Sequence, residues 1–326
     1  MSPECYPWHS GAWSTLAQRV HQLPHALLLH GQQGLGKQAF AQRLARSLLC
    51  AQLTPAAEAC GLCHSCHLFA AGTHPDLLLI HPLEDSKIIV IDQIRAVGGF
   101  LSLRPHTAQH KVVIVSPAEA MNINAANSLL KLLEEPPNGS ILLLVTNHSA
   151  RLPATIRSRC AAIPFKPPSH PEALNWLESY PEAKEQPINL LEQAGGAPLL
   201  ALQLARNGFL ASREQLMQDI EDLGSGREEP IACAARWKGR GTEACLTWLY
   251  GFVFDLIKLG MAGHNEDWPK RETGIIKKYA ISYKELYKFL DVISESRKLL
   301  SGPLDELLLL EDILIRWSRI SCGRLQ

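Results

Sequence analysis

A glycine-rich stretch near the amino terminus has the residues of a phosphate-binding loop. In GQQGLGKQAF, Gly31, Gly34, Gly36 and Lys37 stand where such a loop places its glycines and its lysine. Backbone N–H groups and the start of the following helix can cradle phosphates there, with the lysine on the outer oxygens. The next residue is Gln38, where a magnesium-binding Ser or Thr is typical. The alternative interpretation is a tight strand-to-helix turn that uses glycine for its positive φ.

The other groups that hydrolysis of a nucleoside triphosphate requires are missing from their usual places. A magnesium-binding acid normally follows a neighbouring strand, but the apolar run KVVIV is followed by Ser116 and Pro117. Glu119 stands two or more positions out of register. Because loss of a general base alone costs about 10²–10⁴ in rate, we expect no turnover, although Lys37 could still hold a nucleotide loosely.

Four cysteines within a short stretch have the spacing of a metal site. They are Cys50, Cys60, Cys63 and Cys66. Four thiolates suit a tetrahedral structural zinc, which would also fold the loop between them. An iron–sulfur run normally continues with a further cysteine, and the following HLFAAGTHP has none. Nearby histidines are candidate substitute ligands, namely His64, His67 and His74. Of these, the last is expected to bond locally instead.

A framework of alternating strands and helices must position these residues. Apolar runs typical of buried strands lie at 25–31, 76–82, 111–117 and 140–147. Apolar residues at helical spacing mark 37–50, 91–103 and 123–135. Near-continuous apolar strands alternating with helices predict an α/β domain whose parallel sheet is covered on both faces. The pattern changes after AAIPFKPPS, 161–169, where PFKPPS resembles a linker and no convincing strand follows.

Length indicates several domains, and the absence of a signal peptide together with the cysteine count indicates the cytoplasm. The 326 residues suggest two or three domains, and after the linker the sequence is helical, with long apolar stretches at 243–262 and 304–320. Formal net charge is zero, so strong DNA binding by the chain alone is not expected. No apolar run is long enough to span a membrane, and the first residues lack a signal peptide. Nine cysteines, an odd number, fit reduced thiols.

Two further stretches resemble one known family. NSLLKLLEEPP at 127–137 and TIRSRC at 155–160 are similar to motifs of the AAA+ clamp-loader family, and their spacing matches that family along the first domain. The cysteine insertion followed by AGTHPD, 71–76, resembles the bacterial members that carry zinc and a degraded ATP site. The resemblance covers at least residues 24–206.

The resemblance implies a role for an arginine outside the loop. The family's Ser-Arg-Cys motif falls on Ser158, Arg159 and Cys160, and its arginine reaches ATP bound by the neighbouring subunit, where it stabilises transition-state charge. Without the family, an ordinary surface arginine is the simpler interpretation.

Two ATP-sensing positions of active relatives can also be matched. A sensing arginine of the helical module corresponds to Leu199, so another ATP-handling group is absent. The sensing polar residue at the end of the fourth strand would be Thr146 or Asn147, for which a strand-end cap is an equally good interpretation.

The resemblance also implies an architecture and an assembly. We expect an AAA+ P-loop-like domain at 1–166 with a zinc module at about 50–66, a helical lid at 167–207 and a helical collar at 208–326. The apolar helices of the collar could serve its own core or a ring interface. Implied partners are the gamma/tau ATPase subunits and the clamp-opening delta subunit, in a hetero-oligomeric ring that meets primed DNA and the sliding clamp.

The function that follows from the resemblance is that of a helper subunit. The chain would be a non-hydrolysing part of a DNA-directed DNA polymerase (nucleotidyltransferase) holoenzyme during DNA replication. One alternative is an active ATPase subunit of the same family. The other is a zinc-containing DNA-binding module with a vestigial phosphate loop.

Overall fold

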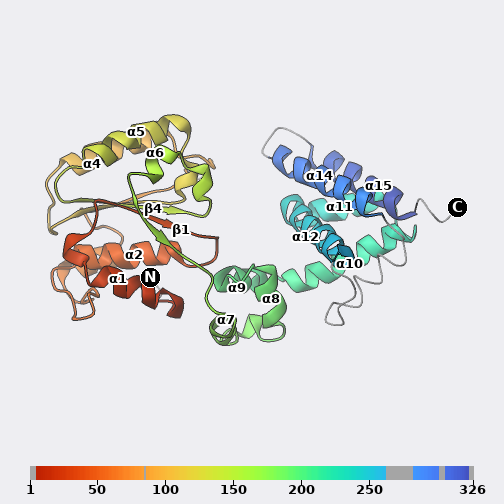
Figure 1. The fold of residues 1–326 in the computed structure, drawn as a ribbon, viewed down its shortest axis with the longest axis horizontal. Helices are drawn as coiled ribbons and strands as arrows, with labels where there is room; N and C mark the ends of the chain where they lie inside the picture. Colours follow the sequence, from red (N-terminus) through yellow and green to blue (C-terminus); the bar gives the residue numbers. More distant parts are fainter. Residues whose placement is uncertain (1–4, 84–85, 262–281, 301–304, 323–326) are drawn as a thin grey trace. The chain divides into compact units, whose positions relative to one another are not determined.

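The chain forms two compact units, Met1–Asn207 and Gly208–Gln326. A computed structural model describes residues 5–83, 86–261, 282–300 and 305–322 (Figure 1). Each unit has its own hydrophobic core. Among the described residues, no helix is long and apolar enough to cross a membrane. The three-part division drawn from the sequence stays a prediction.

A five-stranded parallel sheet forms the centre of the first unit. Its strands are β1 (Ala26–His30), β2 (Leu77–Ile80), β3 (Lys111–Val115), β4 (Ser140–Thr146) and β5 (Ala161–Pro164). Their order is β2-β3-β4-β1-β5, with every pair parallel. The predicted α/β class and parallel sheet are therefore confirmed.

The sheet has a fifth strand, β5, that is not among the four apolar runs of the sequence. Residues 161–164 pair with β1 in parallel, from Leu27 opposite Ala161 to His30 opposite Pro164. The strand is short, lies at the edge of the sheet and is largely exposed, so it lacks the apolar run that marks a buried strand. Proline at its last position is tolerated because the edge needs no further N–H donor.

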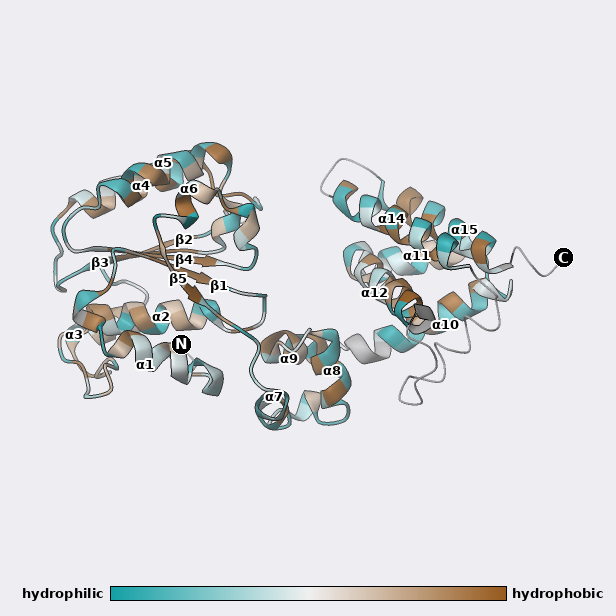
Figure 2. Cartoon of the chain, in the orientation of Figure 1, coloured by the Kyte–Doolittle hydropathy of each residue, from teal (hydrophilic) through white to brown (hydrophobic). Residues whose placement is uncertain are grey.

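Helices cover both faces of the sheet, as the strand pattern predicts (Figure 1). One face carries α1 (Ser10–Ala17), α2 (Lys37–Leu49) and α3 (His64–Ala70), and the other carries α4 (Ile91–Ser102), α5 (Ile123–Glu134) and the short α6 (Ala154–Arg157). Successive residues of β1 alternate between two cores, because Leu27 and Leu29 join the α2 side while Leu28 joins the α4 side. Figure 2 shows the strands as the most hydrophobic elements of this unit.

A small helical lid completes the first unit. It consists of α7 (His170–Leu177), α8 (Pro187–Gln193) and α9 (Pro198–Arg206). The predicted helical module at 167–207 thus corresponds to observed helices. Short 3-10 turns join several elements, among them η1 (Pro7–His9) and η3 (Ala118–Ala120).

The second unit is helical throughout its described residues. It contains α10 (Phe209–Gly224), α11 (Pro230–Arg240), α12 (Thr242–Met261), α14 (Tyr283–Leu299) and α15 (Glu306–Cys322). The predicted helices at 243–262 and 304–320 correspond to α12 and α15, whereas 262 and 304 lie outside the described residues. Most of their aromatic residues are core, including Trp248, Phe252 and Trp317, but Phe254 remains exposed.

Candidate functional site

The glycine loop joins β1 to α2, the context that a phosphate loop requires. Gly34 and Gly36 have φ of +81° and +80°, in the left-handed region that favours glycine. Gly36 also caps the amino terminus of α2, where Lys37 is the first helical residue. The loop therefore has the positive-φ glycines and the strand-to-helix setting that both interpretations of the sequence require, and its phosphate-binding role stays a prediction.

Lys37 is turned inward and bonded within the chain. Its side chain is buried, and Nζ donates to the carbonyl of Gln32 at 2.6 Å and to Oδ1 of Asn147 at 2.8 Å. Burial lowers the pKa of Lys37 to about 8, against a smaller raising effect of the Glu119 carboxylate. Two of the three N–H donors of the lysine are thus used by the loop and by β4's end.

Glu119 belongs to this site although its sequence position argues against it. It lies on η3, and its Oε1 accepts a hydrogen bond of 2.9 Å from the backbone N–H of Asn147. Its Oε2 is buried and has no hydrogen-bond partner. Counting positions from the end of β3 misses this residue, because η3 folds the chain back after that strand. The signal available in the sequence is only an acid a few residues beyond that strand.

The two candidates for the sensing polar residue have different contacts. Asn147 meets Lys37 directly, whereas the hydroxyl of Thr146 accepts a hydrogen bond from the backbone N–H of His148 at 3.1 Å. Thr146 is fully buried at the end of β4. The strand-end cap therefore describes the contacts of Thr146, and Asn147 is the residue placed next to the lysine.

The lid packs directly on the phosphate loop. The backbone N–H of Leu199 donates to the carbonyl of Gly34 at 3.1 Å, and Gln32 donates through Nε2 to the carbonyl of Gly195 at 2.8 Å. A Cβ added to Gly34 would lie 2.5 Å from the Cβ of Leu200, a distance that real Cβ atoms do not reach. Leu199, at the position that matches the sensing arginine of active relatives, contributes a backbone contact to the loop.

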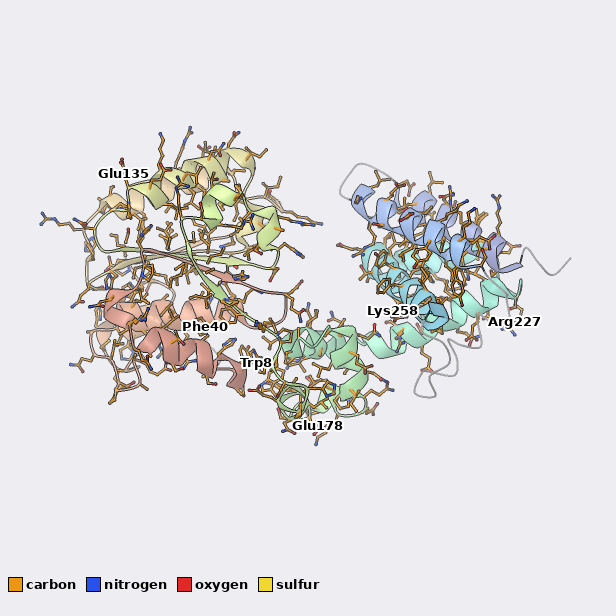
Figure 3. The ribbon with its side chains drawn as sticks, viewed as in Figure 1. Trp8, Phe40, Glu135, Glu178, Arg227 and Lys258 are labelled. Atoms are coloured by element: carbon orange, nitrogen blue, oxygen red, sulfur yellow. The ribbon has the colours of Figure 1, made fainter. Side chains whose placement is uncertain are left out.

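Aromatic residues of the amino-terminal segment close the other side of the loop. Trp8 donates through Nε1 to the carbonyl of Leu35 at 3.0 Å, and its ring stacks on Tyr6. Trp8 lies beside the lid (Figure 3). Its ring meets that of Trp176 of the lid edge to face, with ring centroids 5.3 Å apart. A Cβ on Gly36 would lie 2.6 Å from the ring of Tyr6. The loop is therefore enclosed by contacts from within the chain.

Arg159 lies at the opposite end of the sheet from the phosphate loop. It precedes β5, whose first residue pairs with Leu27 near the amino end of β1, whereas the loop follows the carboxyl end of β1. At about 3.3 Å per residue, the five residues of β1 separate these ends by roughly 13 Å. The guanidinium pairs with Glu134, with Nη2 2.7 Å from Oε1, and Nη1 donates to the carbonyl of Thr155 at 3.1 Å.

The flanking residues of the Ser-Arg-Cys motif have structural contacts. Ser158 donates its hydroxyl hydrogen to the carbonyl of Thr155 at 3.1 Å. Cys160 is half-buried against the core on the α4 side, and burial raises its pKa to about 11. Between them, the side chain of Arg159 remains 37% exposed. The local fold therefore presents the arginine at the surface and holds its neighbours in place.

The four predicted metal-ligand cysteines converge. All four Sγ atoms lie within 4.8 Å of one another, and Cys50 Sγ is 3.6 Å from Cys60 Sγ, 3.8 Å from Cys63 Sγ and 3.6 Å from Cys66 Sγ. Four sulfurs bound tetrahedrally at about 2.3 Å from one zinc would stand about 3.8 Å apart. The cluster therefore has the dimensions to hold a metal such as zinc.

Backbone groups around the cluster favour the thiolate form of the sulfurs. The N–H groups of Cys60, Cys63 and Cys66 lie 3.3–3.4 Å from the sulfur of the preceding cysteine of the cluster. Such donors stabilise the charge that a metal ligand must carry. His74 bonds locally, as expected, since Nε2 contacts the hydroxyl of Ser65 at 2.6 Å and Nδ1 accepts from the backbone N–H of Asp76 at 3.0 Å.

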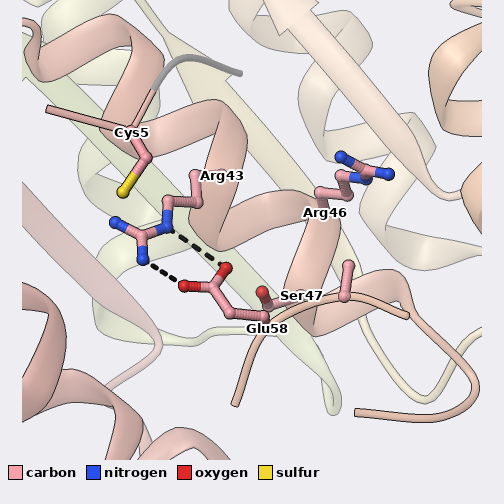
Figure 4. Close-up of a pocket in the computed structure, with 6 residues that line it drawn as sticks. Cys5, Arg43, Arg46, Ser47 and Glu58 are labelled. Atoms are coloured by element: carbon pink, nitrogen blue, oxygen red, sulfur yellow. Dashed lines mark hydrogen bonds and ion pairs between the residues drawn. The ribbon is translucent and has the colours of Figure 1, made fainter. Parts of the chain in front are cut away.

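Side chains outside the cluster fasten the insertion to two helices on one face of the sheet. Glu58 of the insertion forms a bidentate ion pair with Arg43 of α2 (Figure 4). The guanidinium of Arg43 also lies 3.8 Å from the ring centroid of Trp13, and Trp13 donates through Nε1 to the carbonyl of Ala56 at 3.2 Å. A small cavity of about 130 Å³ borders this pair. The insertion is thus held by α1 and α2 as well as by its cysteines.

Two family profiles match this chain. Residues 9–169 match the family described as DNA polymerase III, delta subunit, and residues 207–319 match DNA polymerase III, delta subunit, C terminal. The two matches cover the α/β domain and the helical second unit in turn.

Curated relatives match most of this chain and most of their own lengths. DNA polymerase III subunit delta' of Pseudomonas aeruginosa is 34% identical over 97% of this chain and 98% of its own length. The Escherichia coli protein of the same name is 33% identical over 78% of this chain and 76% of its own. Among solved structures, a DNA polymerase III gamma subunit-related protein of Thermotoga maritima aligns over 95% of this chain and 99% of its own, with 21% identity and a TM-score of 0.47.

Proposed function

Because this chain belongs to the family of DNA polymerase III delta' subunits, we propose that it acts as a non-hydrolysing subunit of the replicative clamp loader. The family membership confirms the resemblance drawn from residues 127–137 and 155–160. In the proposed role, Arg159 reaches the ATP bound by a neighbouring gamma/tau subunit and stabilises charge there during hydrolysis.

The position of Arg159 is the observation that carries this proposal. Because it lies near the amino ends of the strands, the length of β1 separates it from the chain's own phosphate loop at their carboxyl ends. It is exposed enough to meet another subunit. An arginine in this position is too far from the loop of its own chain to contact a phosphate there, which supports a role on a triphosphate that a neighbouring subunit holds.

The state of the phosphate loop supports the non-hydrolysing role. The hydroxyl after Lys37 is absent, and the lysine itself is bonded to Gln32 and Asn147. A bound phosphate would have to compete with these two acceptors and with the lid contacts at Gly34. We therefore assign the loop a structural role, in which it joins the sheet to the lid and to the amino-terminal aromatic residues.

The proposal extends to a structural zinc and to the assembly. A zinc ion held by Cys50, Cys60, Cys63 and Cys66 would fold the insertion without any catalytic part. The implied partners are the gamma/tau ATPase subunits and the delta subunit, in a ring that contacts the sliding clamp and primed DNA. The second unit would supply the collar of that ring, and the cytoplasm is the compartment in which it would work.

Substitution of Arg159 in the reconstituted clamp loader tests the trans role. Arg159→Ala should leave the complex assembled but slow ATP hydrolysis at the one site that the arginine serves by about 10³-fold or more. In steady-state ATPase measurements, the complex should lose the contribution of that site to its total hydrolysis rate. Arg157→Ala, an exposed arginine two residues away, is the matched control and should change little. Unchanged hydrolysis in Arg159→Ala would remove the proposed role.

One observation favours the rival function of an active ATPase subunit. Glu119 brings a buried carboxylate oxygen without a partner close to Asn147, near the place of a catalytic acid. Turnover of ATP by the isolated chain that Glu119→Gln abolishes would establish this rival. No comparable observation favours the DNA-binding module, and the net charge of zero argues against it.

A further inference from the structure

The guanidinium of Arg159 is held by an acid from the LEEPP stretch. Glu134 is the last residue of α5, and its Oε1 lies 2.7 Å from Nη2 of Arg159. Nη1 of the same guanidinium donates to the carbonyl of Thr155 at 3.1 Å. These two contacts come from two helices that are close in space, since α5 packs on α6. The arginine therefore has a defined resting position before any neighbour is bound.

This resting position can be exchanged for a phosphate. The side chains of Arg159 and Glu134 are 37% and 51% exposed, so solvent weakens the attraction between them. A triphosphate carries more negative charge than one carboxylate and accepts from a guanidinium in the same planar fork geometry. Glu134 and the phosphate oxygens would thus compete for the same N–H groups.

We propose that Glu134 is the resting partner of Arg159 and that it competes with ATP on the neighbouring subunit, thereby setting the ATP concentration at which that site fills. The inference rests on the proposed function, since it requires that Arg159 contacts ATP in trans. Glu134 is a positioning residue in this scheme because it acts through the arginine. Its contact is lost in the ATP-bound ground state and in the transition state alike, so its removal changes KM and leaves kcat unchanged.

The Glu134→Gln substitution tests whether ATP displaces Glu134 from the guanidinium of Arg159. The experiment uses ATP as the ligand and the reconstituted clamp loader as the enzyme. Glu134→Gln should lower the KM for ATP by about 1.5-fold to 5-fold, the range that an exposed ion pair corresponds to, and leave kcat unchanged. Glu135→Gln is the matched control, because Glu135 is the adjacent exposed acid and the structure describes no ion pair for it. It removes the same charge next to the same helix end (Figure 3), so its KM should stay at the wild-type value.

The double variant separates this inference from the proposed function. In an Arg159→Ala background, Glu134→Gln should have no effect on KM, because the competition acts only through the guanidinium. If Arg159→Ala slows hydrolysis but Glu134→Gln leaves KM unchanged or raises it, the exchange is refuted while the trans role stands. A KM effect that persists without Arg159, or that Glu135→Gln reproduces, also refutes it. If Arg159→Ala itself leaves ATP hydrolysis unchanged, the proposed trans role of Arg159 is refuted, and the inference that rests on it is refuted with it.

Discussion

At the scale of single residues, buried charges at the strand ends are the most constrained groups of the first unit. Asp76 is fully buried just before β2, and its carboxylate accepts from the backbone N–H groups of His106, Thr107 and Ala108. Burial alone would raise its pKa, but these donors and the nearby Lys111 outweigh it and lower the pKa to about 2. One carboxylate thus orders the loop that leads into β3.

Asparagine at position 76 should destabilise the protein in a pH-dependent way. Because the folded pKa lies below the ordinary value of 3.8, the carboxylate stabilises the fold above pH 4, and this contribution is lost as the pH falls toward 2. Asp76→Asn should therefore lower the free energy of unfolding by about 2 kcal/mol at pH 7, as urea denaturation would measure. Asp92→Asn, at a mostly exposed position, should change it little. A difference that does not shrink below pH 4 would contradict this account.

At the scale of elements, the folded structure of the cysteine insertion is stabilised by few contacts other than those of its cysteines. Its own helix α3 has only seven residues, too short to be stable alone. Outside the cysteines it is fastened mainly by Trp13, by Arg43 and by the hydroxyl of Ser65, which donates to the carbonyl of Leu49 at 2.5 Å. The metal should therefore supply much of its local stability.

Metal content and local exchange should change together in this insertion. The purified chain is expected to hold about one zinc ion, and Cys60→Ser should lose it and speed amide hydrogen exchange in α3. Cys5→Ser, an exposed cysteine outside the cluster, should keep both the metal and the slow exchange. A metal-free chain whose α3 amides remain protected would count against a structural zinc. The strands of the sheet should stay protected in every variant, because their core does not include the cluster.

At the scale of the whole molecule, each of the two compact units is stabilised by its own hydrophobic residues, in two clusters on the faces of the sheet and in one cluster among the helices of the second unit. The helical unit is organised around Asp219 of α10, which accepts hydrogen bonds from Arg236, Trp237 and Arg240 of α11 at 2.7–3.0 Å. Trp237 is fully buried in the same core. This network fixes one helix against the next in a unit that has no sheet to order its described helices.

Alanine at position 219 should therefore affect the second unit alone. It leaves the buried indole N–H of Trp237 and the guanidinium of Arg240 without their acceptor and removes one of the two acidic partners of Arg236, which should cost about 3 kcal/mol of that unit's stability. Hydrogen exchange followed by mass spectrometry should show faster exchange in α10 and α11 and unchanged exchange in β1 and β4. Asp312→Ala, which breaks an exposed pair with Arg316 within one helix, serves as the control. Equal destabilisation of both units would show that they unfold as one.

The α/β architecture and the cluster of four cysteines could be predicted from the sequence because their signals are local. Buried strands at 26–30 and 111–115 are continuous apolar runs, and the glycine loop after the first has a recognisable spacing. The cysteine cluster is also local, since its four ligands lie within one short insertion. The fifth strand escaped prediction because an exposed edge strand needs only pairing with β1, which leaves no hydrophobic pattern.

Amino-acid types and spacing by themselves determined that the chain keeps a phosphate cradle while it lacks the hydroxyl after Lys37, and that four cysteines can share a metal. Only the tertiary structure decided that Lys37 is bonded to Asn147, that Glu119 joins them, and that Arg159 lies at the far end of the sheet beside Glu134. These pairs join residues from 25 to 110 positions apart. Such contacts follow from strand order and helix packing, which no local pattern of residues encodes.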